Sequence, residues 1–307
     1  MASGIALLAC GCRGEPTSEA RDAAKAASSA PVVPVVALDA AAPKRVHWTP
    51  VLRHPHPRCR SIATYGRVEQ EPIGPTDAGA APIAIAGEIP RATWVVLGPD
   101  AKLTTKDPRS GRELSFEGRG RIRPCEGENE TWLVAGTLSS VPGAGEAPGQ
   151  EQWIATPLGV VRYAGAIVKV TSRDGVDIQV ASGSASIWAS DGASAAVAPN
   201  AAEDGWRRLP AGAKATLAGA VPLDRAVATC ISAAKSARDL AEQIAVPDAA
   251  LVVLAPRHVN ARQIARAACT VARLRAESLP QAAAKTLLAT INEAYPPVAE
   301  VRDETRP

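Results

Sequence analysis

Residues 168–180, VKVTSRDGVDIQV, are the stretch that decides the fold class. Apolar residues alternate with polar ones on both sides of Asp174-Gly175. Such alternation places one set of side chains on a core and the other in water, as in a half-buried β-strand. Asp-Gly is a strong signal for a two-residue turn, because glycine accepts the positive φ that such turns need. The stretch therefore predicts a β-hairpin whose valines and isoleucine face inward.

Similar short strands are predicted over residues 83–217, because apolar runs are separated there by turn and loop sequences. The runs are 94–97, 114–116, 132–134, 153–155, 187–188 and 206–209. Helical periodicity then begins, and it predicts three amphipathic helices over 223–245, 258–277 and the segment between Pro280 and Pro296. Residues 251–254 are ambiguous between a strand and a helix end. The predicted fold is mainly β with an α-helical tail.

The second predicted helix carries an apolar side and a basic side. The apolar side contains Cys269, and the basic side is expected to face solvent. The basic residues are Arg257, Arg262, Arg266, Arg273 and Arg275.

The chain of 307 residues is long enough for two domains and a linker. We expect a truncated lipoprotein signal at 1–12, a Pro/Ala-rich linker at 13–46 and a β domain at 47–220. A helical domain at 221–298 and a tail at 299–307 follow. The net charge of +3 does not require a nucleic-acid partner, and we expect none.

The N-terminus resembles the end of a bacterial lipoprotein signal. An apolar run from Ile5 to Ala9 ends at Cys10, and Leu7-Leu8-Ala9-Cys10 resembles a lipobox. The resemblance implies acylation of Cys10 and a lipid-anchored protein of the periplasm or outer membrane. No Lys or Arg precedes Cys10, so the basic part of a signal peptide is missing. Cys12 is a second candidate, and an ordinary apolar N-terminus is the alternative.

The other four cysteines are expected to form disulfides if the chain is exported to an oxidising compartment. Four cysteines allow three connectivities. We favour Cys59–Cys125, within the β-rich region, and Cys230–Cys269, on two apolar helical faces. Four buried free thiols are the alternative.

The central region resembles the FecR domain family. The matching stretches are 153–165, WIATPLGVVRYAG, then 168–170, and 174–187, which contains Gly183 in a V-x-x-G pattern. Leu209-Pro-Ala-Gly212 is similar to the family's closing turn, and the resemblance covers residues 88–218. It implies a sandwich or solenoid-like β domain. Family members are regulators with a sigma-factor-binding segment and a transmembrane helix. This sequence shows neither part, so only a periplasmic binding or scaffolding role is carried over.

The candidate binding residues are Arg119, Arg121 and Arg123. If the chain is extended there, their side chains project from one face and suit an anionic polymer or an acidic partner. Arg109 and Arg112 are expected to add to that charge. A charged, exposed edge strand is the alternative.

Other polar clusters are expected to be solvated or unsuited to chemistry. Glu126, Glu128 and Glu130 predict an acidic loop, and His54 and His56 lie among prolines. No metal site, cofactor or catalytic residue is predicted, since no nucleophile, zinc or phosphate-binding motif is present.

These observations favour a non-enzymatic envelope lipoprotein that binds a protein partner or an envelope polymer. The alternative is a periplasmic sensor in a sigma-factor regulatory system. A cell-wall hydrolase is a third class, which would need a pair of carboxylates in a pocket.

Overall fold

The computed structural model describes residues 59–71, 81–90, 93–108, 110–127, 129–197, 202–203, 205–244 and 251–296. The chain divides into two compact units, Met1–Ala42 and Pro43–Pro307, and every described residue belongs to the second. Cys10, Cys12, His54, His56 and the tail at 299–307 lie outside the described residues. The predicted lipidation site and linker are therefore not part of the fold described below.

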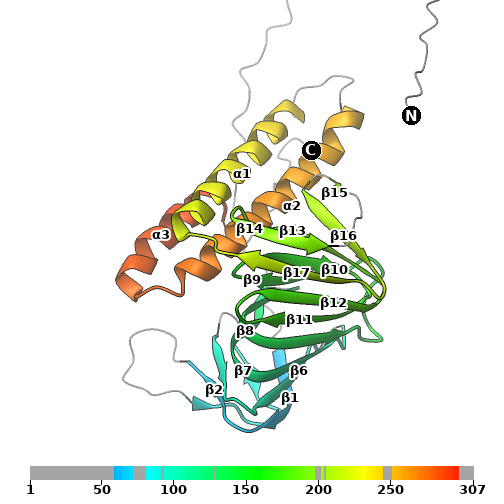
Figure 1. Cartoon of the computed structure of the whole chain (residues 1–307), viewed down its shortest axis with the longest axis vertical. Helices are drawn as coiled ribbons and strands as arrows, with labels where there is room; N and C mark the ends of the chain where they lie inside the picture. Colours follow the sequence, from blue (N-terminus) through cyan, green and yellow to red (C-terminus); the bar gives the residue numbers. More distant parts are fainter. Residues whose placement is uncertain are drawn as a thin grey trace, which may run out of the picture. The chain divides into compact units, whose positions relative to one another are not determined.

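Within the described residues, strands come first and three helices follow, so the chain is mainly β as predicted (Figure 1). The first strands are β1 (Cys59–Tyr65), β2 (Val68–Gln70), β3 (Ala81–Pro82), β4 (Glu88–Ile89), β5 (Val95–Leu97), β6 (Lys102–Lys106), β7 (Glu113–Gly127) and β8 (Glu130–Val141). They continue with β9 (Gln152–Thr156), β10 (Gly159–Tyr163), β11 (Ile167–Ser172), β12 (Val176–Ser182), β13 (Ser184–Ala189), β14 (Ala193–Val197), β15 (Ala202–Glu203), β16 (Trp206–Pro210) and β17 (Lys214–Gly219). The helices are α1 (Leu223–Ile244), α2 (Leu251–Ala276) and α3 (Gln281–Ala294).

The predicted hairpin is present as β11 and β12, but its turn contains the three residues 173–175 and not the predicted two, and Gly175 does not have a positive φ. Its two strands pair antiparallel, with Val170 opposite Ile178 and Ser172 opposite Val176 across the turn. The valines and Ile178 are buried, whereas Lys169, Asp177 and Gln179 are exposed. Period-two alternation therefore predicted both the element and its inward face.

Two long strands, β7 and β8, link two sets of strands. One half of β8 pairs antiparallel with β11, placing Leu138 opposite Val170, and the other half pairs parallel with β9, placing Thr131 opposite Ile154. The register between β7 and β8 shifts after Glu117, beside Gly118 and Gly136, whose φ values are 76° and 105°. Glycine tolerates this left-handed region, so the hairpin bends there and its two halves join different sets of strands.

The pairings define two layers. The hairpin layer contains β14, β17, β12, β11, β6 and β1, and the covered layer contains β15, β16, β13, β10, β9, β5 and β2. In β10 the successive residues Val160 and Val161 are both fully buried, so both faces of this strand are covered. Helix α2 contacts β9 and β10 on one face, and the hairpin layer closes the other.

Helix α2 begins at Leu251, so the ambiguous segment 251–254 belongs to it, and Pro256 lies in its first turns. Its second half is buried nearly all round because α1, α3 and the covered layer all pack against it. The expectation that Arg273 faces solvent is wrong: Arg273 is 7% exposed and donates to Asn292 Oδ1 at 2.9 Å. No helix in the described ranges is long and apolar enough to cross a membrane.

Both expected disulfides are present. Cys59 joins Cys125 with the Cα atoms 5.9 Å apart, and Cys230 joins Cys269 with the Cα atoms 4.5 Å apart. The first ties the start of β1 to β7, and the second ties α1 to α2. The buried residues of strands and helices form one continuous core, so the region expected as a separate helical domain shares its core with the β region.

Candidate functional site

The three candidate arginines lie on β7, beyond the bend, in three different environments. Arg119 is exposed, Arg121 is partly buried and Arg123 is 7% exposed. The expectation that they form one exposed stripe is wrong for Arg123, and β7 is not an edge strand. It pairs with β8 on one side and with β6 and β5 on the other.

Arg123 is the centre of a buried polar group that connects β7 to the end of α2. Its Nη1 donates to Glu126 Oε2 at 2.9 Å and to Glu277 Oε1 at 3.1 Å, and its Nη2 pairs with Glu277 Oε2. The guanidinium lies 4.4 Å from the ring centroid of Trp94 and 4.9 Å from that of Trp132. Trp94 Nε1 also donates to Glu277 Oε2 at 3.2 Å. We call these five residues the Arg123 cluster.

Glu130 extends this polar region along α2. It accepts from Trp132 Nε1 at 2.7 Å, from Arg266 Nη2 at 3.0 Å and from Thr270 Oγ1 at 3.2 Å. Burial acts to raise the pKa of Glu130, but Arg266 and these hydrogen bonds outweigh it and hold the pKa below its ordinary value. The expected solvated acidic loop is therefore wrong at this residue, because α2 covers it.

The pKa of Glu126 is shifted in the opposite direction from the pKa of Glu130. Burial raises the pKa of Glu126 to about 6, Arg123 opposes the shift, and the nearby Glu130 and Glu277 add to it. Glu126 is thus not a solvated carboxylate either, and Glu128 lies outside the described residues. Three carboxylates share this region with Arg123, Arg266 and Arg273, and two of the ion pairs, Arg123–Glu277 and Arg266–Glu130, join the strands to α2 or its end.

A second buried pair was not expected from the sequence. Arg112, expected to add to an exposed charge, is 2% exposed and pairs with Glu146, while its Nη1 donates to Ser140 Oγ at 2.7 Å. Its guanidinium lies 5.1 Å from the ring centroid of Tyr163. These contacts hold the loop around residue 146 against the strands. Arg109 lies outside the described residues.

These buried ion pairs stabilise the packing of the segments that they join. A buried ion pair with its hydrogen bonds made resists the removal of either partner, because the remaining charge would be unpaired. Both oxygens of Glu277 accept from the cluster, and the Arg123 guanidinium contacts the rings of both Trp94 and Trp132. Among the described residues no group of three or more His, Cys, Asp or Glu side chains is placed to hold a metal ion.

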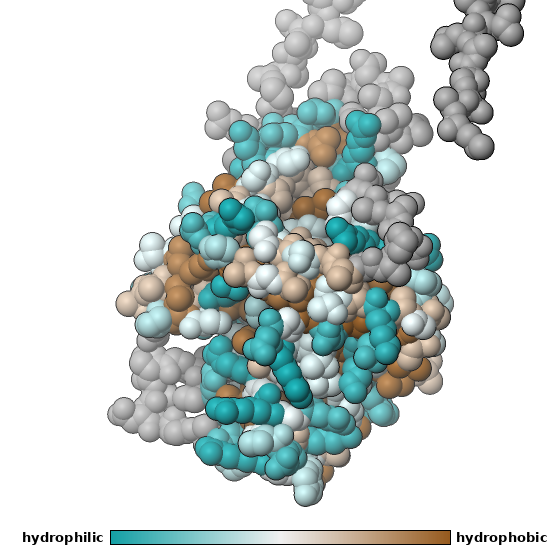
Figure 2. Space-filling model, viewed as in Figure 1, coloured by the Kyte–Doolittle hydropathy of each residue, from teal (hydrophilic) through white to brown (hydrophobic). Residues whose placement is uncertain are grey.

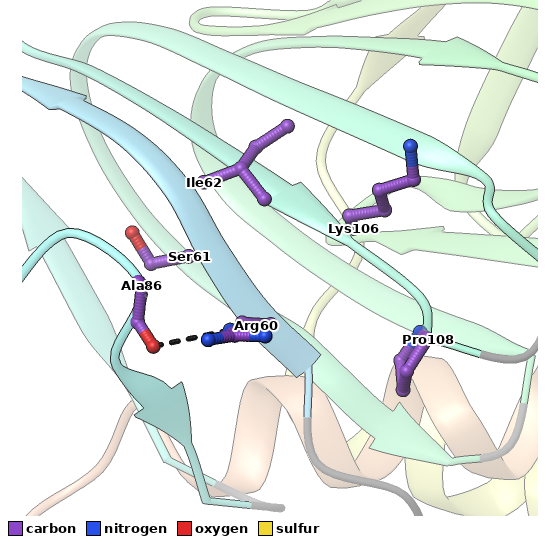
Figure 3. A pocket seen from close by; sticks show the side chains of 6 residues that line it. All are labelled: Arg60, Ser61, Ile62, Ala86, Lys106 and Pro108. Atoms are coloured by element: carbon purple, nitrogen blue, oxygen red, sulfur yellow. Dashed lines mark hydrogen bonds between the residues drawn. The ribbon is translucent and has the colours of Figure 1, made fainter.

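A pocket at the surface of the described residues lies beside β1. This pocket, of about 320 Å³, is lined by Arg60, Ser61, Ile62, Ala86, Lys106 and Pro108. In Figure 3, the side chains of Ile62 and Lys106 lie in the upper part of the view, and those of Arg60 and Pro108 lie below them. In Figure 2, hydrophilic side chains gather over the lower strands of the view, where Figure 1 places β1, β6 and β7. The pocket therefore combines apolar walls with a basic rim.

The turn before β4 shapes one side of this pocket. Gly87 N donates to Ala84 O at 3.1 Å, and Ala86 between them has a φ of 60°, which is rare for a residue with a Cβ. The turn directs the Ala86 carbonyl to Arg60 Nε at 3.2 Å and the Gly87 carbonyl to Ser61 N at 2.9 Å. It thus closes the edge of β1 as far as Ser61.

Sequence patterns did not identify this site. Arg60 and Lys106 are 46 positions apart and become cross-strand partners only when β1 pairs with β6. Ile62 is the extra residue of a bulge, since Ser61 pairs with Thr105 and Ala63 with the adjacent Thr104. The only local feature that could have pointed to it is Gly87, a turn residue that follows a run of aliphatic residues.

Comparisons with known proteins give no family for the chain. No protein-family model matches it, and none of the curated proteins matches it. Among solved structures, two crystal structures of a protein provisionally assigned as an anti-sigma factor, from Parabacteroides distasonis ATCC 8503, align with a TM-score of 0.31 each, at 10% and 9% identity. Each alignment covers 39% of this chain and 52% of the other, so this chain spans about half of that protein's length. Likeness at this level carries no functional argument.

Proposed function

We propose that the chain is a non-enzymatic, lipid-anchored protein of the bacterial cell envelope whose FecR-like β domain binds a protein partner or an envelope polymer. The observation that carries the location is the pair of disulfides, which join positions 66 and 39 residues apart. Disulfides persist in oxidising compartments such as the bacterial periplasm and are rare in the cytosol. Acylation of Cys10 supplies the anchor in this proposal.

The binding role is supported by how the chain uses its charges. The buried arginines Arg112 and Arg123 are held by carboxylates of the same chain, and they fasten a loop and a helix to the strands. A scaffold fixed in this way presents its exposed strands rigidly. The two layers of strands favour the sandwich form of the FecR-like domain over a solenoid.

The test begins with the native protein in envelope fractions under non-reducing conditions. We expect it to sediment with membranes, to show an acylated Cys10 by intact mass spectrometry, and to retain both disulfides. A Cys10→Ser variant should be released in folded form, whereas Cys12→Ser should remain bound, because only Cys10 follows the lipobox. A soluble cytosolic pool with an unmodified N-terminus and reduced cysteines would contradict the proposal.

A further inference from the structure

The edge of β1 beyond Ser61 is open in the described part of the chain. β4 pairs with β1 only at Cys59 and Arg60, and the Gly87 carbonyl accepts from Ser61 N. From residue 62 to residue 65, the side of β1 away from β6 has no strand partner among the described residues. Unpaired backbone groups at a sheet edge are a template for another extended chain.

Apolar side chains are exposed at the same place. Ile62 is 38% exposed, Ile85 is 64% exposed and Tyr65 is 71% exposed. Ile62 and Tyr65 belong to the open stretch, and Ile85 lies in the turn that ends the closed stretch. Single exposed apolar residues are ordinary, but three near one open edge, one of them lining a pocket, indicate a contact surface.

The rim of the pocket selects a negatively charged occupant. Arg60 and Lys106 are directly opposite one another across β1 and β6, so their side chains share one face of the strands. Among the described residues, Arg60 donates to the Ala86 carbonyl and lies opposite Glu88 across β1 and β4, and Lys106 Nζ pairs with Glu113 at 3.2 Å, with both side chains 46% exposed. Exposed pairs of this kind contribute little to stability, so a carboxylate from a partner can take the place of Glu113.

A different sheet edge, that of β14, shows how such an edge is protected. On β14, which pairs with β17, the Ala195 carbonyl accepts from Arg207 Nη1 at 2.6 Å. A side chain of the same chain thus occupies that edge, whereas the described residues place none on the open stretch of β1. At β1 the open edge, the apolar pocket and the basic rim coincide.

We propose that the open edge of β1 docks an extended, acidic segment of a partner protein, whose aliphatic side chain fills the pocket beside Ile62 and whose carboxylate meets Arg60 and Lys106. This inference rests on the proposed binding function and names the partner's chemistry. An anionic polymer has charges for the rim, but it has neither an aliphatic side chain for the pocket nor a main chain for the edge.

The test uses the purified full chain panned against a random library of short peptides, with binding of the selected peptides measured by fluorescence anisotropy. We expect the selected peptides to carry a carboxylate next to an aliphatic residue. Arg60→Glu should weaken their binding about tenfold or more, because a charge-assisted contact becomes repulsive. Replacing the peptide's acid with lysine should restore binding to that variant. Lys169→Glu, at an exposed lysine of β11, is the matched control and should bind like the wild type.

Hydrogen exchange locates the contact. Bound peptide should slow exchange of amides between residues 62 and 65, because a strand that pairs with the edge takes up its unpaired backbone groups. The inference is overturned if no peptide is selected, if Arg60→Glu binds selected peptides unchanged, or if the protected amides lie elsewhere. Binding of polyphosphate that depends on Arg60, without any peptide binding, would also overturn it in favour of a polymer site.

Photocrosslinking in the native envelope separates this inference from the proposed function. A photoreactive residue at position 62 should capture a protein, and one at position 169 should not. Capture from position 169 alone would leave the binding function intact and refute the β1 site. Capture from neither position, together with failed peptide selection, would count against both.

Discussion

Two faces of the strands carry charged side chains, and they do so under opposite conditions. On the outer face of the hairpin layer, Lys169 and Asp177 are exposed to water. On the face of the covered layer, Arg266 of α2 lies 4.2 Å from the ring centroid of Trp153, and Arg162 of β10 lies 4.3 Å from that of Trp206. Charge on the first face is solvated and nearly independent of the fold. Charge on the second face is stacked, paired and part of the contact with the helices.

The largest expected effect separates these two faces by single substitutions. Arg123→Ala should lower the free energy of unfolding by about 3–5 kcal/mol, because it leaves Glu126 and Glu277 buried without their cation. Lys169→Ala, its control on the outer face, should change it by about 0.5 kcal/mol or less. Urea unfolding followed by tryptophan fluorescence measures both. Equal effects of the two substitutions would remove the distinction between the faces.

The next prediction tests what holds the helices over the covered face. Replacing Cys230 and Cys269 together with alanine should reduce the free energy of unfolding by about 2–4 kcal/mol, since the crosslink constrains the unfolded chain. The same change at Cys59 and Cys125 should cost about 0.5 kcal/mol more, because the closed loop is longer, 66 residues against 39. Urea unfolding without reductant measures both. An unchanged urea midpoint for the Cys230 and Cys269 variant would show that packing alone fixes α1 to α2.

The sequence predicted the outer face far better than the covered one, for a physical reason. Alternation in residues 168–180 reports which side of a strand meets water, and that was enough to place β11 and β12. Cysteine count and helical spacing likewise favoured the Cys230–Cys269 disulfide, which the structure contains. These are local signals.

The covered face depends on partners that local signals do not reveal. Arg123 meets Glu277 across 154 positions, and Arg266 meets Glu130 across 136. A charged residue on a strand, loop or amphipathic helix is usually solvated, so the sequence predicted exposed side chains for Arg123, Glu130 and Arg273. The bend beside Gly118 and Gly136 added to the error, because it moves the second half of β7 from β6 of the hairpin layer to β5 of the covered layer. The β1 pocket was missed for the same reason, since it exists only through the pairing of β1 with β6.

The smallest expected effect is a pH dependence that belongs to the covered face alone. Burial raises the pKa of Glu126 from 4.5 to about 6, so the folded state binds its proton more tightly than the unfolded state. Its contribution to stability is therefore present below about pH 4.5 and is lost as pH rises through about 6, a change of about 2 kcal/mol. Glu126→Gln, which stays neutral, should abolish this change in urea unfolding curves measured from pH 7 to pH 4.5. Glu113→Gln, at an exposed carboxylate, is the control and should keep the pH dependence of the wild type.

Glu130 affects stability in the opposite direction. Because its pKa is lowered in the folded state, its contribution to stability is lost only as pH falls below the ordinary range of a carboxyl group. If the stability of the wild type and of Glu126→Gln changes alike with pH, Arg123 compensates fully for the burial of Glu126. A charged carboxylate would then cost no more free energy on the covered face than on the solvated outer face.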